Sequence, residues 1–107
     1  MSEAAITKKV KTLLDGYILN GEPLYYNKIS DKFTSGMADV QGTFHGISWY
    51  IELKDIGKKA RKLQEWHLRN ARRAGAEVLS TDSYDEVVTF MERIRLNHEH
   101  IVKARYL

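Results

Sequence analysis

Trp49-Tyr50-Ile51-Glu52-Leu53-Lys54 is rich in aromatic and aliphatic residues and ends in an acid and a base. This composition predicts a β-strand, on which successive side chains point to opposite faces. Glu52 and Lys54 then share one face with Tyr50, whereas Ile51 and Leu53 point to the other face. A carboxylate and an ammonium group therefore project side by side from the end of an otherwise apolar strand.

A second carboxylate stands at the entry to the strand before it. Residues 39–44 and 47–54 read as two strands joined by a tight turn at His45-Gly46, and Asp39 begins the first of them. Two carboxylates beside an ammonium group can hold a hard divalent cation and activate a water against a phosphodiester. The Glu-x-Lys pattern is weak by itself, because an exposed cross-strand ion pair also produces it.

The sequence predicts seven secondary-structure elements. Helices are expected over about 3–19, 58–74 and from 84 onward, and strands over 24–29, 39–44, 47–54 and 76–80. Ser2 and Ser83 are predicted N-caps, because their hydroxyls can accept from free N–H groups of the first turn. Gly75 is a predicted C-cap. The apolar stripe of the second helix is predicted to be Leu63, Trp66, Asn70 or Ala71, and Ala74.

The order of these elements predicts an α/β fold. The first three strands can form an antiparallel meander, and the fourth follows a crossover helix, so it should run parallel to its neighbour through a right-handed connection. Helices would then cover both faces of a mixed four-stranded sheet. The 107 residues fit one domain, with a core over about 3–92 and a C-terminal tail over 97–107.

The composition is that of an ordinary globular protein, with 43% hydrophobic and 29% charged residues. The sequence contains no cysteine, which excludes disulfides, thiolate metal sites and a cysteine nucleophile, and suits a reducing compartment. The N-terminus lacks the apolar core of a signal peptide, and no apolar run approaches membrane-spanning length. We therefore expect a cytoplasmic protein with no membrane partner.

The net charge of +3 is unevenly distributed. Residues 58–73 hold seven Lys or Arg against one acid, Glu65. Since the chain has 17 Lys and Arg and 14 Asp and Glu, the remainder carries 10 bases and 13 acids, a net charge of −3. A basic helix alone is usually a solvated surface, but this one follows the acidic strand end directly, which favours a polyanionic partner.

Four segments together resemble the VRR-NUC domain, the virus-type replication and repair nuclease domain of the PD-(D/E)xK superfamily. They are Gly36-Met37-Ala38-Asp39, Ile51-Glu52-Leu53-Lys54, Gln64 on the following helix, and Gly75-Ala76 before a strand. The resemblance extends from Glu3 to about Glu92 and implies a restriction-endonuclease-like αβββαβα core. The family usually has proline before the first aspartate, where this chain has Ala38. That difference removes some rigidity from the turn but no ligand.

The resemblance implies a metal site. Asp39 and Glu52 would bind Mg²⁺ or Mn²⁺ together with the backbone carbonyl of Leu53. Glu3 would reach the same site from the first helix, through water or a second metal, although it can equally serve only to complement the helix dipole. Mg²⁺ takes oxygen ligands and keeps several waters, so two carboxylates and one carbonyl suffice.

The resemblance also implies roles around the metal. Lys54 would orient or deprotonate the attacking water and stabilise developing negative charge. Gln64 would help to position the water or the scissile phosphate; without the resemblance it reads equally well as an exposed polar residue. Basic side chains can contact DNA phosphates, which gives affinity without sequence preference. The candidates for these contacts are Lys58, Lys59, Arg61, Lys62, His67, Arg69 and Lys8.

The function implied by the resemblance is that of a metal-dependent, structure-specific DNA endonuclease. Small phage members resemble Holliday-junction resolvases and form homodimers, which implies a junction resolvase that acts in the cytoplasm, or in the host cytoplasm if a phage encodes it. Cutting two symmetry-related strands is simplest for a twofold dimer. The alternatives are a flap or nicking nuclease of phage replication or repair, and a non-cutting DNA-binding module. Four apolar tail residues either join a dimer interface or fold back on the core: Ile101, Val102, Tyr106 and Leu107.

The remaining aromatic and histidine residues are given structural roles. Trp49 and Trp66 are predicted to be core residues rather than base-stacking platforms. His45 is assigned to the hairpin turn. His98 and His100, two positions apart, do not share a helix face and are predicted to lie on the surface.

Overall fold

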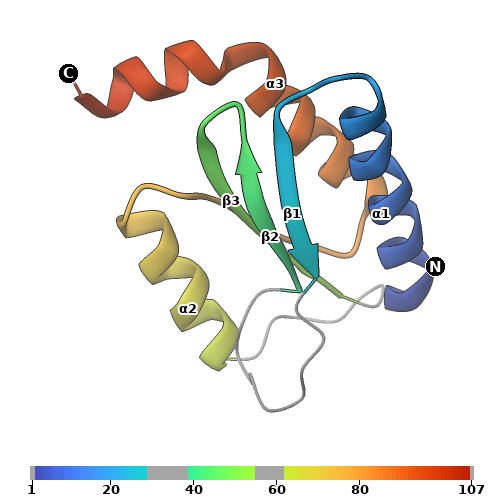
Figure 1. Ribbon diagram of the computed structural model, residues 1–107. Coiled ribbons are helices and arrows are strands. Elements are labelled where there is room, and N and C mark those ends of the chain that lie inside the picture. Colours follow the sequence, from blue (N-terminus) through green and yellow to red (C-terminus); the bar gives the residue numbers. More distant parts are fainter. Residues whose placement is uncertain (1, 29–38, 55–61, 107) are drawn as a thin grey trace.

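The computed structural model describes residues 2–28, 39–54 and 62–106. The elements along the chain are α1 (Glu3–Leu19), β1 (Leu24–Lys28), β2 (Val40–Phe44), β3 (Ile47–Leu53), α2 (Lys62–Arg73), β4 (Glu77–Thr81) and α3 (Tyr84–Tyr106). The four strands form one sheet in the order β1-β2-β3-β4 (Figure 1). β1, β2 and β3 are antiparallel, and β4 is parallel to β3. The predicted α/β fold and mixed sheet are confirmed.

Helices cover both faces of the sheet, with α1 and α3 on one face and α2 on the other (Figure 1). The alternation along β3 produces this arrangement, because Ile47, Trp49, Ile51 and Leu53 are all fully buried in the core formed with α1 and α3. The residues between them point toward α2. Glu52 and Lys54 therefore lie on the α2 face, as the strand pattern predicts.

The β2–β3 hairpin fixes the register that matters for the site. His45 and Gly46 both have positive φ, 51° and 81°, which is the two-residue turn whose twist matches that of paired strands. Gly42 sits beneath the Trp49 indole, and a Cβ atom there would lie 2.0 Å from the carbonyl oxygen of Tyr25. The absence of a side chain at Gly42 thus lets β1 and Trp49 approach closely.

The predicted helix caps are present. The Ser2 hydroxyl accepts from the Ala5 N–H at 3.2 Å, and the Ser83 hydroxyl accepts from the Glu86 N–H at 3.3 Å. Gly75 has φ +106° and follows α2. Its N–H donates to the Arg72 carbonyl, and the next N–H donates to the Ala71 carbonyl, a pairing that satisfies two free carbonyls of the last turn.

The predicted apolar stripe of α2 is wrong. Gln64 and Leu68 are the buried residues of this helix, whereas Leu63 is 48% and Trp66 is 52% exposed. Hydrophobicity alone predicts that Leu63 and Trp66 face the sheet. The helix instead buries the polar Gln64, because its side chain forms hydrogen bonds with Glu52 and Lys54.

The predicted tail over 97–107 begins at a kink in α3 and is helical as far as Tyr106. α3 continues to Tyr106 across a kink at Asn97 (φ −125°, ψ 16°). Ile101 belongs to the buried core, so this residue folds back, while Val102 is 36% exposed. His98 is half-buried rather than on the surface, because its ring stacks on His45 with centroids 4.2 Å apart. Leu107 and the Tyr106 side chain lie outside the described residues.

Several predictions fall where the structure gives no description. Lys58, Lys59 and Arg61 lie outside the described residues, as do the predicted helix start at 58–61 and the segment 29–38, which includes Ala38. Across the ranges that are described, no helix has the length and apolar character needed to cross a membrane.

Candidate active site

The hairpin register brings the two predicted carboxylates together. Val40 pairs with Ile51 across β2 and β3, so Asp39, one residue earlier, stands opposite Glu52. An Asp39 side-chain oxygen accepts from the Leu53 N–H at 2.7 Å, which fixes the carboxylate at the end of β3. Asp39 is half-buried and Glu52 is only 1% exposed. The acidic pair is thus built mainly by strand pairing.

Lys54 and Gln64 complete a closed set of hydrogen bonds around Glu52. Lys54 Nζ donates to Glu52 Oε1 at 2.7 Å and also donates to Gln64 Oε1. Gln64 Nε2 in turn donates to the same Glu52 oxygen. Gln64 is 5% exposed, so the amide closes the site from the α2 side. The Lys54 ammonium group is held in one direction by two acceptors.

The second oxygen of Glu52 is the exception in this network. Glu52 Oε2 is buried and, among the described residues, has no hydrogen-bond partner. Burial is the main cause that raises the pKa of Glu52 to about 7; the hydrogen bond from Lys54 opposes this shift, and the negative charge of Asp39 adds to it. An unpaired buried oxygen beside a second carboxylate is destabilising unless a proton or a cation lies between them.

The donor set fits a hard divalent cation. Within the described ranges, no three His, Cys, Asp or Glu side chains converge as a ligand cluster. Two carboxylates remain, Asp39 and Glu52, with the Leu53 carbonyl as the further predicted ligand. A set this small suits Mg²⁺ or Mn²⁺, which keep several water ligands, and does not suit an ion that needs a full protein cage.

The other predicted site residues are spread over two helices. Glu3 is half-buried in the first turn of α1, which begins at the end of the sheet where β3 stops (Figure 1). Its role in the site stays a prediction. Lys8 is exposed on α1, and Lys62 and Arg69 are exposed on α2. His67 is half-buried, with its ring edge-on to Trp66 at a centroid distance of 4.9 Å.

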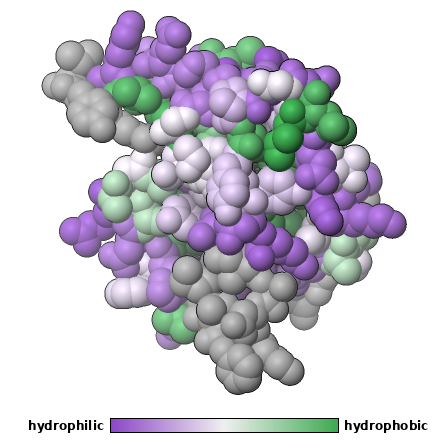
Figure 2. All heavy atoms as spheres, in the orientation of Figure 1, coloured by the Kyte–Doolittle hydropathy of each residue, from purple (hydrophilic) through white to green (hydrophobic). Residues whose placement is uncertain are grey.

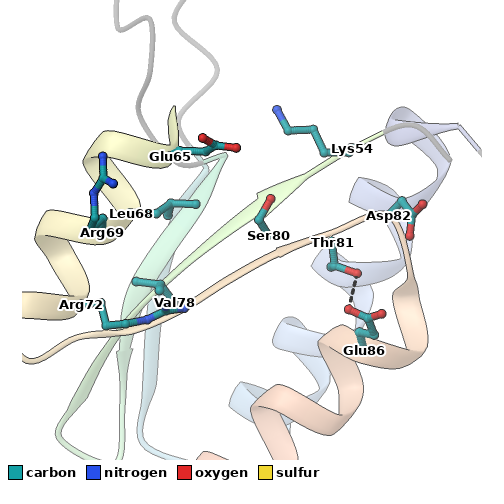
Figure 3. A pocket seen from close by; sticks show the side chains of 10 residues that line it. All are labelled: Lys54, Glu65, Leu68, Arg69, Arg72, Val78, Ser80, Thr81, Asp82 and Glu86. Carbon is teal, nitrogen blue, oxygen red and sulfur yellow. Dashed lines mark hydrogen bonds between the residues drawn. The ribbon is translucent and has the colours of Figure 1, made fainter. Parts of the chain in front are cut away.

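An open cleft of about 510 Å³ adjoins Lys54 between α2, β4 and the start of α3 (Figure 3). Arg69 and Arg72 line it from α2, and the Ser80 hydroxyl points into it from β4. Glu65 reaches toward Lys54 across the opening, while Glu86 is engaged with Thr81 at 2.7 Å. The cleft lining thus combines three cations and the Ser80 hydroxyl with three carboxylates, those of Glu65, Asp82 and Glu86.

Sequence reasoning missed the contributions of Ser80 and Arg72 to this cleft. The signal for Ser80 is the parallel register, which pairs it with Glu52, but β4 begins and ends one residue later than predicted. Arg72 was counted only as part of the basic helix, because its direction depends on which face of α2 packs against the sheet.

No family model matches the sequence, and a comparison with curated proteins finds no match. Among solved structures, a protein described as a VRR_NUC domain superposes with a TM-score of 0.66, covering 86% of this chain and 97% of that one. This chain has the VRR-NUC fold. Sequence identity to that VRR-NUC structure is 22%, so the likeness is one of fold. The chemistry of the VRR-NUC fold in this chain depends on its own residues.

Proposed function

We propose that the chain is a metal-dependent, structure-specific DNA endonuclease whose site is formed by Asp39, Glu52, Lys54 and Gln64. The observation that carries this proposal is the unpaired buried oxygen of Glu52 beside Asp39. A module that only binds DNA has no use for two adjacent acids at a phosphate-binding surface, because like charges repel. A site that holds a cation needs them.

The residues divide the work of phosphodiester hydrolysis. When bound, Mg²⁺ or Mn²⁺ would supply Lewis acidity and lower the pKa of a coordinated water. Asp39 and Glu52 would hold the ion, with Glu3 close by. Lys54 places positive charge where negative charge develops on the phosphate, and Gln64 fixes the direction of its amine by accepting from it. The predicted contact of Gln64 with the water or the scissile phosphate stays a prediction beside this acceptor role.

The proposed substrate class rests on the exposed basic residues. The described residues include no separate module for reading base edges, while Lys8, Lys62 and Arg69 are exposed and available to phosphates. We propose that the enzyme recognises DNA shape, with the four-way junction as substrate and a twofold homodimer as the cutting unit. A flap or a nicked duplex is the alternative substrate within the same activity.

Cleavage assays test the proposal directly. Labelled four-way junction, flap and linear duplex are incubated with Mg²⁺, Mn²⁺ or EDTA, using the wild type, Asp39→Asn and Glu52→Gln. Glu99→Gln is the matched control, since Glu99 is exposed on α3. We expect paired junction cuts that disappear in EDTA and in both site variants but persist in Glu99→Gln. A monomer mass in sedimentation together with flap cutting alone would favour the alternative substrate.

A binding readout separates the site from its activity. Mn²⁺ should raise the midpoint of thermal unfolding of the wild type and of Glu99→Gln, and should not raise that of Glu52→Gln. Lys54→Met should keep the metal effect but lose at least about a hundredfold in cutting rate, the cost typical of one charge-stabilising donor. Tight DNA binding with no cutting under any metal, and no stabilisation by metal, would leave a DNA-binding module and sink the enzyme proposal.

A further inference from the structure

Trp66 is an exposed indole on the helix that supplies Gln64 to the site. It is 52% exposed, in contrast to Trp49, which is fully buried. Its ring meets the His67 ring edge-on, which leaves the larger part of one indole surface in solvent. Leu63, one turn earlier, is 48% exposed. This apolar pair lies on the face of α2 that points away from the sheet.

Cations surround the indole on the same helix face. Lys62, Arg69 and Arg73 stand at four positions before, three after and seven after Trp66, which places all of them in its row along α2. All three are exposed. Glu65 points instead toward the cleft beside Lys54 (Figure 3). The surroundings of Trp66 are thus positive as well as partly apolar.

This combination fits a nucleobase better than a protein surface. Trp and Arg also occur often at protein–protein interfaces, but Lys is depleted at their centres, and a protein partner would have to supply an acid for each of the three cations that it desolvates. The visible side of the molecule shows small separate hydrophobic patches rather than one continuous apolar area (Figure 2). A base stacked on an aromatic ring, with its flanking phosphates on neighbouring cations, satisfies both features at once.

We propose that Trp66 is a stacking platform for an unpaired base of the DNA substrate, with Lys62, Arg69 and Arg73 holding the adjacent phosphates. The proposal rests on the nuclease function above and favours the flap, the alternative substrate, over the four-way junction, because a four-way junction is fully base-paired and a flap carries unpaired nucleotides. In continuous duplex, both faces of each base are already stacked, so an indole outside the helix gains nothing without unstacking a base. Gln64 lies on the same helix but faces the sheet, so the platform lies across α2 from the acidic pair.

Binding without cutting tests the platform. In EDTA, affinities of the wild type, Trp66→Ala and Leu63→Ala are measured for a single strand, a flapped duplex and a continuous duplex. We expect Trp66→Ala to weaken single-strand and flap binding about tenfold, the usual loss for one stacked base, and to leave duplex binding unchanged. Leu63→Ala, which removes apolar surface but no ring, should bind all three as the wild type does.

Tryptophan fluorescence gives a second readout on the unaltered protein. Single-stranded DNA should quench wild-type emission strongly, and should barely change Trp66→Phe, whose remaining indole is the buried Trp49. An equal loss for duplex and flap in Trp66→Ala, or no loss at all, would overturn the platform. The platform would also be overturned if Trp66→Ala changed the oligomeric mass in solution and left DNA affinity intact, because a second copy of the chain would then occupy the surface around Trp66.

Failure of the platform and failure of the nuclease give different results. If Trp66→Ala binds and cuts flaps as the wild type does in Mg²⁺, stacking is wrong and the nuclease stands. If the wild type cuts nothing, yet single-strand binding still depends on Trp66, the platform stands and the enzyme proposal is wrong.

Discussion

Glu52 is the residue in which fold and proposed chemistry conflict most directly. Its carboxylate is buried, accepts from Lys54 and Gln64 through one oxygen, and has its other oxygen beside Asp39. Burial raises the pKa of Glu52 to about 7. The metal-free protein therefore keeps a proton on Glu52 at pH values below about 7, whereas a metal site needs the carboxylate.

This conflict predicts a pH dependence of stability in EDTA. Because the folded-state pKa of Glu52 is raised, its contribution is fully present below the ordinary value of 4.5 and is lost as pH rises through about 7. The free energy of unfolding should fall between pH 5 and pH 8, by up to about 3 kcal/mol at 1.36 kcal/mol per pKa unit. Glu52→Gln cannot ionise and keeps an oxygen for Lys54, so it should lack this loss.

Urea unfolding at each pH measures the difference between the two proteins. Glu99→Gln, at an exposed position, should follow the wild type. If the free energy of unfolding changed with pH in the same way for the wild type and Glu52→Gln, ionisation of Glu52 would not destabilise the metal-free protein.

At the scale of elements, the type and order of the helices and strands could be predicted from the sequence better than the face that each helix turns toward the sheet. Strand alternation and the two-residue turn predicted β2 and β3 within one residue at each end, and hence the meeting of Asp39 with Glu52. The facing side of α2 was not predictable from hydrophobicity. Its inward residues are Gln64 and Leu68, and the partners of Gln64 are Glu52 on β3 and Lys54 just after it, which come together only when the sheet is assembled. Local pattern carries no information about such a partner.

The β1–β2 contact gives a matched pair of glycine predictions. Gly42→Ala would place a methyl group against the Tyr25 carbonyl and the Trp49 ring, and should lower the free energy of unfolding by about 2–3 kcal/mol. Gly16→Ala, in α1, meets nothing within 4 Å and should raise it by about 1 kcal/mol, because alanine favours helices. Chemical denaturation measures both. A neutral Gly42→Ala would mean that β1 shifts freely on the sheet.

At the scale of the whole molecule, the C-terminal residues could not be placed from the sequence. The predicted tail over 97–107 mixes apolar and charged residues, and nothing in its local sequence distinguishes a dimer contact from a return to the core. In the structure, α3 bends at Asn97 and returns Ile101 to the common core of α1, the sheet and α3. His98 reaches His45 at the far end of the sheet from the site.

Two neighbouring residues test how far the core extends along α3. Ile101→Ala should cost about 2–3 kcal/mol of unfolding free energy, because Ile101 is only 9% exposed. Val102→Ala, at 36% exposure, should cost less than about 0.5 kcal/mol. Thermal and urea unfolding give both values. If both substitutions lowered the free energy of unfolding by the same small amount, the end of α3 would not unfold cooperatively with the core.

The parallel pairing of β4 with β3 sets an order of events for folding. β2 and β3 are joined by two residues, whereas β4 reaches β3 only after residues 54–76 have closed a long loop. Loop closure slows the formation of contacts between distant residues, so we expect the hairpin to lie in the transition state and β4 to join later. Ile47→Val should then slow refolding, and Leu79→Ala should mainly accelerate unfolding. Asp39 and Glu52 would therefore come together before Gln64 packs against them, so the site would form in two steps during folding.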